Sequence, residues 1–340
     1  MPQGIDTSSE TGFFYSLQPH LILDAVEALG YRCTGRSIAL NSMENRVYEI
    51  ELDLDERSIK SPSEKFLVAK FYRPGRWTKE QILDEHRFIL DCVNNEIPVV
   101  APISDSKGNT LQEMSEAKIF FAVFPKQGGR IEQELDEAAL ERMGRLIARL
   151  HTVGAVREAP NRLRINPETY GRQNIEFLNV SGMIPEDYRE AYFRYAELLL
   201  DYITPMFEGI KVQRIHGDCH AGNVLWGSDG PTLVDFDDML VGPPVQDIWL
   251  LIPGRDQVAK EKQKIFLSGY EMLRPFDRST LNLIEALRTL RIIHFAAWIA
   301  KRWEDPSFKT FFSYFGTNQY WREQIEILAE QWEVLQGTDV

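Results

Sequence analysis

Hydrophobic and polar positions in the first third of the chain follow patterns that are typical of strands. Two segments either alternate apolar with polar side chains or are rich in β-branched and aromatic residues, and two further apolar runs have the length of a strand. These predicted strands are residues 45–52, 66–72, 99–103 and 119–124. The N-terminal part is therefore expected to be small and rich in strands.

Two helices are predicted beside these strands. Pro19 suits the first turn of a short helix that ends before Gly30. Thr78 is followed three residues later by Gln81, and this capping box predicts a helix that runs to about Asn95.

The pattern becomes mainly helical after a break at Pro125 and the pair Gly128-Gly129, which predict a hinge. Residues 132–151 carry apolar side chains at helical spacing, and helices are predicted again from about residue 258 to the end. Short strand-like segments interrupt this part at residues 214–216, 223–226 and 232–235. The pattern as a whole predicts an α+β protein, with the ligand site in a cleft between its strand-rich and helical parts.

Length and charge narrow the classes of function. A chain of 340 residues with 44% hydrophobic content is long for one simple domain, so two coupled lobes or two domains are expected. The net charge is −13, and no run of Lys or Arg offers a surface for nucleic acid, which is not expected as a partner. A protein this acidic must bind phosphate groups through local devices such as a lysine, a metal ion or backbone amides.

Cysteine usage and hydropathy favour a cytoplasmic protein. Cys33, Cys92 and Cys219 are an odd number at wide spacing, which argues against a disulfide framework or a zinc site and for a reducing compartment. The N-terminus has no apolar core of a signal peptide. The longest apolar stretch, near residues 292–300, is too short to span a bilayer, so no membrane association is expected.

The strongest chemical signal is the loop 216–223, His-Gly-Asp-Cys-His-Ala-Gly-Asn, followed by Val-Asp-Phe-Asp-Asp at residues 234–238. Asn223 lies five residues after Asp218, and Asp235 lies twelve after Asn223. A short loop followed by a β-turn would bring these three oxygen-bearing side chains to one end of a hairpin. Phosphoryl transfer needs a carboxylate that orients the acceptor and hard oxygen ligands for Mg²⁺. The alternative is that these residues only cap turns.

This motif is similar to the catalytic and metal-binding loops of the superfamily that contains protein kinases and aminoglycoside phosphotransferases. More closely, the chain resembles the bacterial stress response kinase A family, the YihE or RdoA type, over residues 15 to 335. The segments that carry the resemblance are residues 40–48, 70–74, 216–223, 241–247 and 297–303. The resemblance implies a two-lobed protein-kinase-like fold, with a small antiparallel-sheet N-lobe and a mostly helical C-lobe. It also implies a cytoplasmic Ser/Thr protein kinase with a role in stress survival.

The resemblance implies a role for each residue of the motif. Asp218 would be the catalytic acid that orients the acceptor hydroxyl. Asn223 and Asp235 would bind Mg²⁺, and Asp235 counts among the catalytic residues as well. Asp247 matches a position that ties down the catalytic loop. Asp237 replaces the glycine that usually follows Asp-Phe in protein kinases. Asp237 or Asp238 would bind a second metal ion or simply add charge near the site.

Three residues of the N-terminal part are candidates for binding ATP. Lys70 lies late in an apolar strand, where it could hold the α and β phosphates, and Glu85 on the next helix could pair with it. The alternatives are a strand-end lysine whose charge reaches solvent and a solvated helix glutamate. The resemblance implies that Ser42 contacts ATP, although residues 42–45 could equally form a polar hairpin turn without glycine.

The predicted boundaries are a loose tail at 1–14, an N-lobe at 15–124, a hinge at 125–130 and a C-lobe at 131–340. A further cluster of large aromatic residues would lie either in the core, which helix position favours, or at the cleft, where it could bind a cationic substrate. Its members are Trp298, Trp303, Tyr320 and Trp321.

Three functions follow from these observations. The first is an ATP- and Mg²⁺-dependent Ser/Thr protein kinase that works as a monomer on a protein substrate. The second is a kinase for a small acceptor such as an aminoglycoside, a choline-like molecule or a sugar alcohol, which the same residues could serve. The third is a pseudokinase that only senses nucleotide, against which the intact catalytic residues argue.

Overall fold

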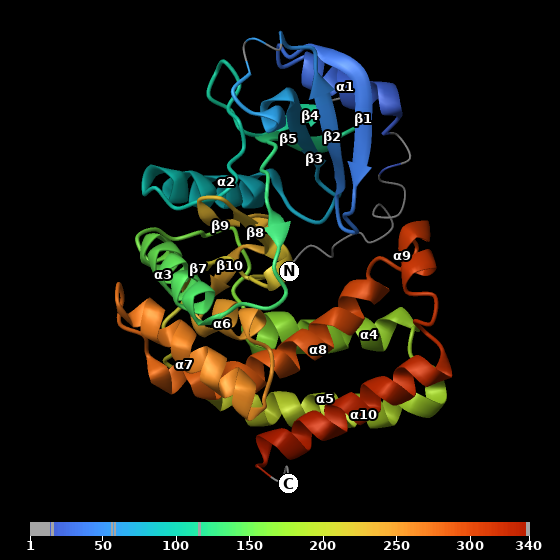
Figure 1. The fold of residues 1–340 in the computed structure, drawn as a ribbon. Helices are drawn as coiled ribbons and strands as arrows, with labels where there is room; N and C mark the ends of the chain where they lie inside the picture. The colour runs from blue at the N-terminus through green and yellow to red at the C-terminus, as the bar shows by residue number, and fades with distance from the viewer. Residues whose placement is uncertain (1–13, 15–16, 56, 58, 115–116, 338–340) are drawn as a thin grey trace.

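The computed structural model describes residues 14, 17–55, 57, 59–114 and 117–337. Almost all of the predicted tail lies outside these residues. The described chain forms an upper lobe built on a sheet and a larger lower lobe built mainly of helices (Figure 1). The predicted α+β fold with two lobes is confirmed. No helix in the described part of the chain is both long enough and apolar enough to cross a membrane.

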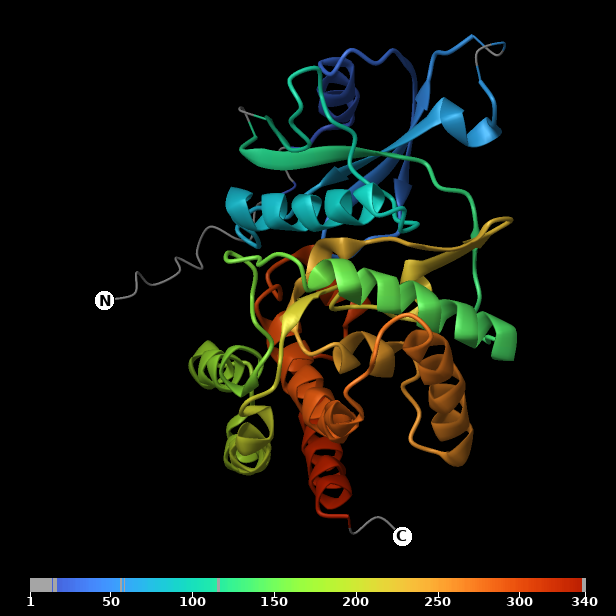
Figure 2. The same ribbon diagram turned by 90° about the vertical axis from the view of Figure 1, so that its left-hand side faces the viewer.

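The N-lobe contains an antiparallel sheet of five strands in the order β1-β2-β3-β5-β4. The strands are β1 (Cys33–Leu40), β2 (Arg46–Leu52), β3 (Phe66–Phe71), β4 (Gln112–Met114) and β5 (Ile119–Pro125). The two helices of the lobe are α1 (Pro19–Glu27) and α2 (Lys79–Asn94), and η3 (Pro62–Lys65) is a single short turn. In the second view, α2 lies between the sheet and the C-lobe (Figure 2).

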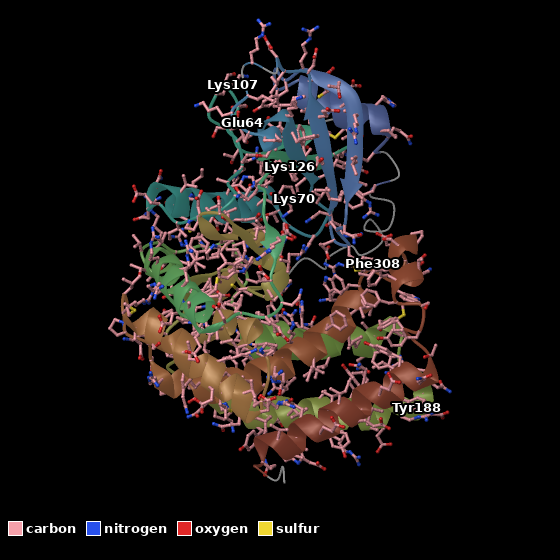
Figure 3. All side chains as sticks on the ribbon, in the orientation of Figure 1. Glu64, Lys70, Lys107, Lys126, Tyr188 and Phe308 are labelled. Atoms are coloured by element: carbon pink, nitrogen blue, oxygen red, sulfur yellow. The ribbon has the colours of Figure 1, made fainter. Side chains whose placement is uncertain are left out.

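Strand β3 decides which side chains face the C-lobe. Leu67, Ala69 and Phe71 pack into one apolar core together with buried residues of α1. Because side chains alternate between the two faces of a strand, Lys70 must point to the opposite face. Figure 3 shows Lys70 at the edge of the N-lobe that is next to the C-lobe.

The predicted start of α2 is confirmed. Thr78 accepts a hydrogen bond from the backbone N–H of Gln81, and the Gln81 side chain accepts one from the backbone N–H of Thr78. The predicted strand at residues 99–103 is wrong, since only Val99 forms a bridge there. Pro102 has no N–H to donate, which prevents a continuous ladder along this apolar run.

The C-lobe is assembled from eight α-helices among the described residues. They are α3 (Glu137–Gly154), α4 (Gln173–Ser181), α5 (Glu186–Ile203), α6 (Val245–Leu251), α7 (Gln257–Glu271), α8 (Ile284–Ala300), α9 (Pro306–Phe311) and α10 (Asn318–Leu335). Short helical turns connect them at η4 (Pro167–Arg172), η5 (Thr204–Phe207), η6 (Ala221–Asn223), η7 (Phe236–Asp238) and η8 (Arg278–Leu283). Helix α3 begins five residues later than predicted, because Asp136 caps it by accepting the N–H of Ala139.

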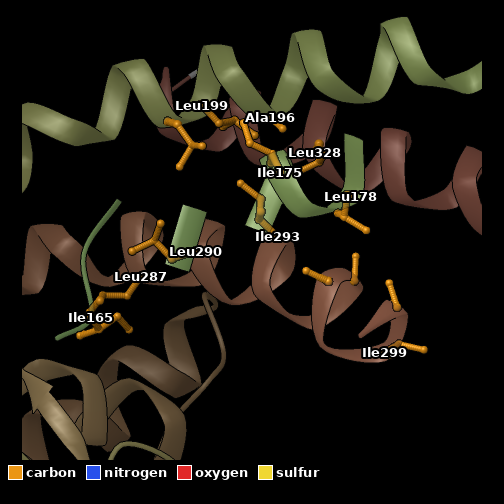
Figure 4. Close-up of a cluster of buried hydrophobic side chains, with 14 of the residues drawn as sticks. Ile165, Ile175, Leu178, Ala196, Leu199, Leu287, Leu290, Ile293, Ile299 and Leu328 are labelled. Atoms are coloured by element: carbon orange, nitrogen blue, oxygen red, sulfur yellow. The ribbon is translucent and has the colours of Figure 1, made fainter. Parts of the chain in front are cut away.

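Two cores hold these helices together. Leucine and isoleucine side chains of α4, α5, α8 and α10 interlock in the lower C-lobe, as Leu178, Leu199, Leu290 and Leu328 show (Figure 4). Helices α3 and α7 approach closely at Gly144, where a Cβ atom would lie 2.1 Å from the carbonyl oxygen of Phe266. The close approach of α3 and α7 therefore depends on the absence of a side chain at this position.

Short strands of the C-lobe connect the cores to the predicted chemistry. They are β6 (Arg130–Ile131), β7 (Gln213–Ile215), β8 (Val224–Gly227), β9 (Gly230–Leu233) and β10 (Leu240–Gly242). Strands β6, β8 and β9 form one small sheet, and β7 pairs with β10 in another. The sequence predicted β7, β8 and β9 but missed β6 and β10, which have too few residues to show a period.

Candidate active site

The predicted catalytic loop, residues 216–223 after β7, is held at its start by Asp247 on α6, as the resemblance implied. Its carboxylate accepts the backbone N–H groups of His216 at 2.9 Å and Gly217 at 2.8 Å. The same carboxylate lies 3.0 Å from Nε2 of the buried His151. The buried carboxylate of Asp247 thus takes part in three hydrogen bonds, and these hold the start of the loop in one conformation.

Gly217 brings the catalytic loop against the segment that carries the second motif. Its φ is +87°, a left-handed conformation that favours glycine. A Cβ atom at this position would lie 2.1 Å from the carbonyl oxygen of Asp238. Only glycine allows this close approach of the two loops.

Asp218 lies at the end of this turn with both carboxylate oxygens engaged. One oxygen is 3.0 Å from a guanidinium nitrogen of Arg291 on α8, and the other is 3.3 Å from Nε2 of His220. Burial alone would raise the pKa of Asp218, but the hydrogen bond from His220 and the charge of Arg291 hold it well below its usual range. The carboxylate is therefore ionised at neutral pH and able to accept a hydrogen bond.

Asn223 and Asp235 lie side by side at the open end of the β8–β9 hairpin. The backbone N–H of Val234 donates to the carbonyl of Asn223 at 3.0 Å, which places Asp235 one residue beyond this pair. The amide nitrogen of Asn223 donates to the carbonyl of Asp218 at 2.9 Å, so its amide oxygen is left for another partner. Asp235 adopts a left-handed conformation with φ of +57° and ψ of +69°, which is uncommon outside glycine and concentrates at functional sites.

Lys70 comes from the N-lobe and reaches three carboxylates. Its ammonium group is 3.1 Å from Asp235, 3.1 Å from Asp237 and 4.0 Å from Glu85. Burial alone would lower the pKa of Lys70, but these carboxylates raise it well above its usual range. The predicted neighbours Lys70 and Glu85 are thus brought together, across a space shared with the second motif.

Glu85 is the buried partner of Lys70, with a side chain only 1% exposed. Burial raises its pKa to about 7 even though Lys70 and Arg162 act in the opposite direction. The alternative interpretation of Glu85, a glutamate on the solvated face of its helix, is therefore wrong.

Arg76 lies between the two aspartates that follow Asp235 and Phe236. Its guanidinium forms ion pairs with Asp237 and with Asp238. Burial alone would raise the pKa of Asp237, but Arg76, Lys70 and Arg162 lower it below its usual range. Asp237 is thus a buried member of an ion-pair network that joins both lobes.

Ser42 lies in the turn between β1 and β2, where it was predicted to contact ATP. Its hydroxyl accepts the backbone N–H of Asn45 at 3.3 Å and so helps to build the turn. The neighbouring Glu44 reaches the C-lobe, because its carboxylate accepts hydrogen bonds from Arg302 at 3.0 Å and from the indole N–H of Trp298 at 2.9 Å.

Sequence reasoning missed the residues that connect these segments. The partners of Arg76, Glu44 and Arg291 are far away in the chain. Glu44 lies within residues 40–48, which carried the resemblance, but it was given no role there. Arg76 lies six residues after Lys70, beside another such segment, and Arg291 carries no motif.

The other singled-out side chains are mainly structural. His216 is buried, packs 4.4 Å from the ring of Phe236, and lies 3.0 Å from the carbonyl of Val234. Cys92 and Cys219 are buried free thiols, and Cys33 is partly exposed. The favoured core position of the aromatic cluster is confirmed for Tyr320 and Trp321, which are 1% and 0% exposed, while Trp298 and Trp303 pack at the edge of the same core.

The donor set fits a magnesium ion that is shared with phosphate groups. Among the residues that the structure describes, no three His, Cys, Asp or Glu side chains gather into a self-sufficient metal site. The amide oxygen of Asn223 and the carboxylate of Asp235 are two hard oxygen donors carried at the same end of the β8–β9 hairpin. Mg²⁺ is usually held by one or two protein side chains together with water and substrate phosphates.

The chain is similar to a known protein family and to curated relatives. The phosphotransferase enzyme family matches residues 39–279. Stress response kinase A of Escherichia coli K12 is 37% identical over 324 residues, which cover 95% of each chain. The serine/threonine protein kinase RdoA of Salmonella typhimurium is 35% identical over 95% of this chain and 94% of its own.

Solved structures share the fold at low sequence identity. An amicoumacin kinase in complex with AMP-PNP and Ca²⁺ superposes with a TM-score of 0.69 at 19% identity, over 90% of this chain and 93% of its own. A spectinomycin phosphotransferase in complex with ADP and spectinomycin has a TM-score of 0.63 at 14% identity, over 91% of this chain and 98% of its own.

Proposed function

Because the chain belongs to the phosphotransferase enzyme family and, within it, to the stress response kinase A family, we propose that this kinase transfers the γ-phosphate of ATP to Ser or Thr hydroxyl groups of proteins. We further propose that Mg²⁺ is its metal ion and the cytoplasm its compartment. A monomer, as expected from the sequence, completes the proposal and can be checked by light scattering.

One observation carries the proposal. Lys70 of the N-lobe and Asp235 of the C-lobe are 165 residues apart in the chain, yet they lie 3.1 Å from each other. Asn223 is beside Asp235 on the hairpin, and its side chain bonds to the backbone of Asp218. A phosphate-binding lysine, two metal-binding oxygens and an acceptor-orienting carboxylate are the groups that phosphoryl transfer uses.

Each residue would act through position and charge. Lys70, oriented by Glu85, would bind the α and β phosphates once the nucleotide separates it from Asp235. Asn223 and Asp235 would hold Mg²⁺, which neutralises the charge that develops on the transferred group. Asp218 would accept a hydrogen bond from the acceptor hydroxyl and align it for in-line attack.

The acceptor hydroxyl has to compete for Asp218. Both carboxylate oxygens are already engaged by Arg291 and His220, whose side chains are 47% and 42% exposed. These partly exposed groups can turn away when an acceptor enters, and they keep Asp218 ionised until then.

A small-molecule acceptor is the second candidate function, and one feature favours it. Helix α6 begins at Val245, only ten residues after Asp235, and η7 and β10 occupy most of that connection. The chain therefore lacks a long segment after Asp235 on which a peptide could be held. A nucleotide-sensing pseudokinase is a weaker candidate, because Lys70, Asp218 and Asn223 are all in place.

The test is transfer of labelled phosphate from γ-labelled ATP with Mg²⁺, offered in parallel to a protein lysate and to a panel of metabolites. Asp218→Ala should lower transfer by about 100-fold or more, since the acceptor loses its orienting base. Asp187→Ala, an exposed position on α5, is the matched control and should transfer normally.

The destination of the label decides between the functions. Label in protein Ser or Thr supports the proposal, whereas label only in metabolites would overturn the protein substrate and favour the second candidate. ATP binding without transfer to either panel, in the wild type as in Asp218→Ala, would favour the nucleotide sensor.

A further inference from the structure

A cavity of about 870 Å³ lies in the C-lobe outside the catalytic site. Its walls come from the end of α3 and the segment after it, from β7 and from the end of α7, which lie close together in Figure 1. Neither Lys70 nor any of the three motif residues Asp218, Asn223 and Asp235 lines it. The cavity is therefore separate from the proposed phosphotransfer site.

The lining of this cavity is positively charged in a protein whose net charge is −13. Its cationic side chains are Arg157, Arg162, Arg164, Lys211, Arg214 and Arg274. Against these six, the lining contains only the carboxylates of Glu158 and Asp277. So local an excess of one sign focuses an attractive potential for anions.

Half of these cations are already satisfied within the protein. Arg157 and Arg214 share Asp91, at 3.3 Å and 2.8 Å. Arg162 donates to the carbonyl of Met239 at 2.6 Å and lies 3.9 Å from a carboxylate oxygen of Glu85. These three guanidinium groups have structural partners and do not require a ligand.

The other three cations lack acidic partners among the described residues. Arg164 and Lys211 are exposed and form no ion pair there. Arg274 donates from one terminal nitrogen to the side chain of Gln213 at 2.7 Å, but its other terminal nitrogen is buried without any hydrogen bond. A buried donor with no hydrogen-bond partner is unfavourable, so such a group calls for an acceptor that completes it.

From this arrangement we propose that the cavity binds a small phosphate-bearing anion. Its volume is within the range of about 300–1,000 Å³ that small-molecule sites occupy. Arginine side chains suit phosphate because their planar donors match two oxygens at once. Val156, Pro275 and Phe276 add apolar wall, which suits a phosphate carried on an organic molecule.

The proposed anion site is additional to the phosphotransfer function. Its walls nevertheless contact the segment that follows Asp235. Arg162 lines the cavity and also donates to the carbonyl of Asp237, in the segment that follows Asp235. The backbone of Val241, another lining residue, bonds to Leu163 and Ile165 at 2.9 Å each. An anion in the cavity would therefore rest on the segments that hold the metal-binding loop in place.

Calorimetric titration of the full chain with inorganic phosphate, without nucleotide or metal, tests the proposal. A Lys70→Met variant lacks the buried lysine of the proposed phosphotransfer site. This variant should still bind phosphate in the C-lobe cavity. The double variant Arg164→Gln with Lys211→Gln should weaken binding tenfold or more. Both residues are exposed, so their replacement should leave the fold intact.

Lys107→Gln is the matched control, because Lys107 is exposed at the far end of the N-lobe (Figure 3). Its replacement should change the affinity for phosphate by less than twofold. Arg274→Gln supplies an independent loss of the buried donor, with unfolding midpoints to show that it still folds. Absence of saturable binding, equal binding by the double variant, or loss of binding in Lys70→Met would each overturn the proposal. Binding of citrate but not phosphate would overturn the phosphate class.

Discussion

At the scale of single residues, the shared space around Lys70 is the most informative feature. One ammonium group faces three carboxylates, and Glu85 is the most deeply buried of them, with a side chain 1% exposed. In the proposed function, a nucleotide that brings its own negative charges would take Lys70 away from Asp235 and leave the buried Glu85 and Asp237 as its protein partners.

The raised pKa of Glu85 predicts a pH dependence of stability. Between pH 4.5 and about 7, the folded protein keeps a proton on Glu85 that the unfolded chain has released. The free energy of unfolding should therefore fall as the pH rises through this window, by on the order of 1–3 kcal/mol. Glu85→Gln should lose this decline, which urea unfolding at pH 5 and pH 8 without nucleotide would measure.

The matched control is Glu80→Gln, an exposed carboxylate in the first turn of the same helix. It should unfold with the pH dependence of the wild type. If the decline persists in Glu85→Gln, another group causes it and the burial argument for Glu85 is wrong.

At the scale of elements, the loop 216–223 is held by a close backbone contact. Gly217 and Gly182 both have left-handed φ angles, +87° and +69°, but a Cβ atom would clash only at Gly217. Gly182→Ala should lower the free energy of unfolding by about 1 kcal/mol, the cost of the conformation alone. Gly217→Ala should lower it by more than that and should also abolish phosphate transfer, since Asp238 must move.

Unfolding free energies and transfer rates of the two variants, measured together, check this prediction. Equal losses of stability would mean that the contact with Asp238 adjusts easily and that the loop does not depend on it.

Elements also show how far the sequence could lead. The strand that places Lys70 and the capping box of Thr78 were visible, because alternation and capping are local patterns. The apolar run at residues 99–103 also looked like a strand, yet a strand needs donors as well as apolar side chains, and Pro102 lacks one. Short elements such as β10 are defined by their partner strand and leave no local signal.

The residues of the candidate site also fall into those that a local pattern reveals and those that only the fold brings together. Asp218, Asn223 and Asp235 are close in the chain, so their spacing revealed them as a group. Arg291 and Arg76 meet these loops only through the fold, and no local pattern connects segments so far apart. Their contacts could not be predicted without the arrangement of the two lobes.

At the scale of the whole molecule, Glu44 and its arginine partners join the lobes. Its carboxylate lies 3.1 Å from Arg73 and 2.8 Å from Arg302, while Arg73 also pairs with Asp305 at 2.9 Å. This network connects the turn that contains Ser42 to α8 and to the start of α9. The relative position of the lobes is therefore fixed partly by buried charge.

Glu44→Gln should destabilise the protein strongly, by about 3–5 kcal/mol, because it leaves buried guanidinium groups without their shared carboxylate. Urea unfolding measures the effect. Glu49→Gln is the control. Glu49 lies on β2, just after this turn, and pairs with the partly exposed Lys126, so its replacement should lower the free energy of unfolding by no more than about 1 kcal/mol. Similar losses in both variants would show that the lobes are held by other contacts.

Because two of the three thiols are buried, their reaction with a thiol reagent would report local unfolding of the native protein. Burial raises the pKa of Cys92 to about 12 and that of Cys219 well above its usual range, whereas Cys33 is partly exposed on β1. A maleimide dye should therefore attach slowly at Cys33 in the folded protein and reach the other two only when the core between α2 and the C-lobe is exposed. Mass spectrometry of the labelled peptides would then time this exposure without any engineered cysteine, and early modification of Cys219 would show that the catalytic loop opens by itself.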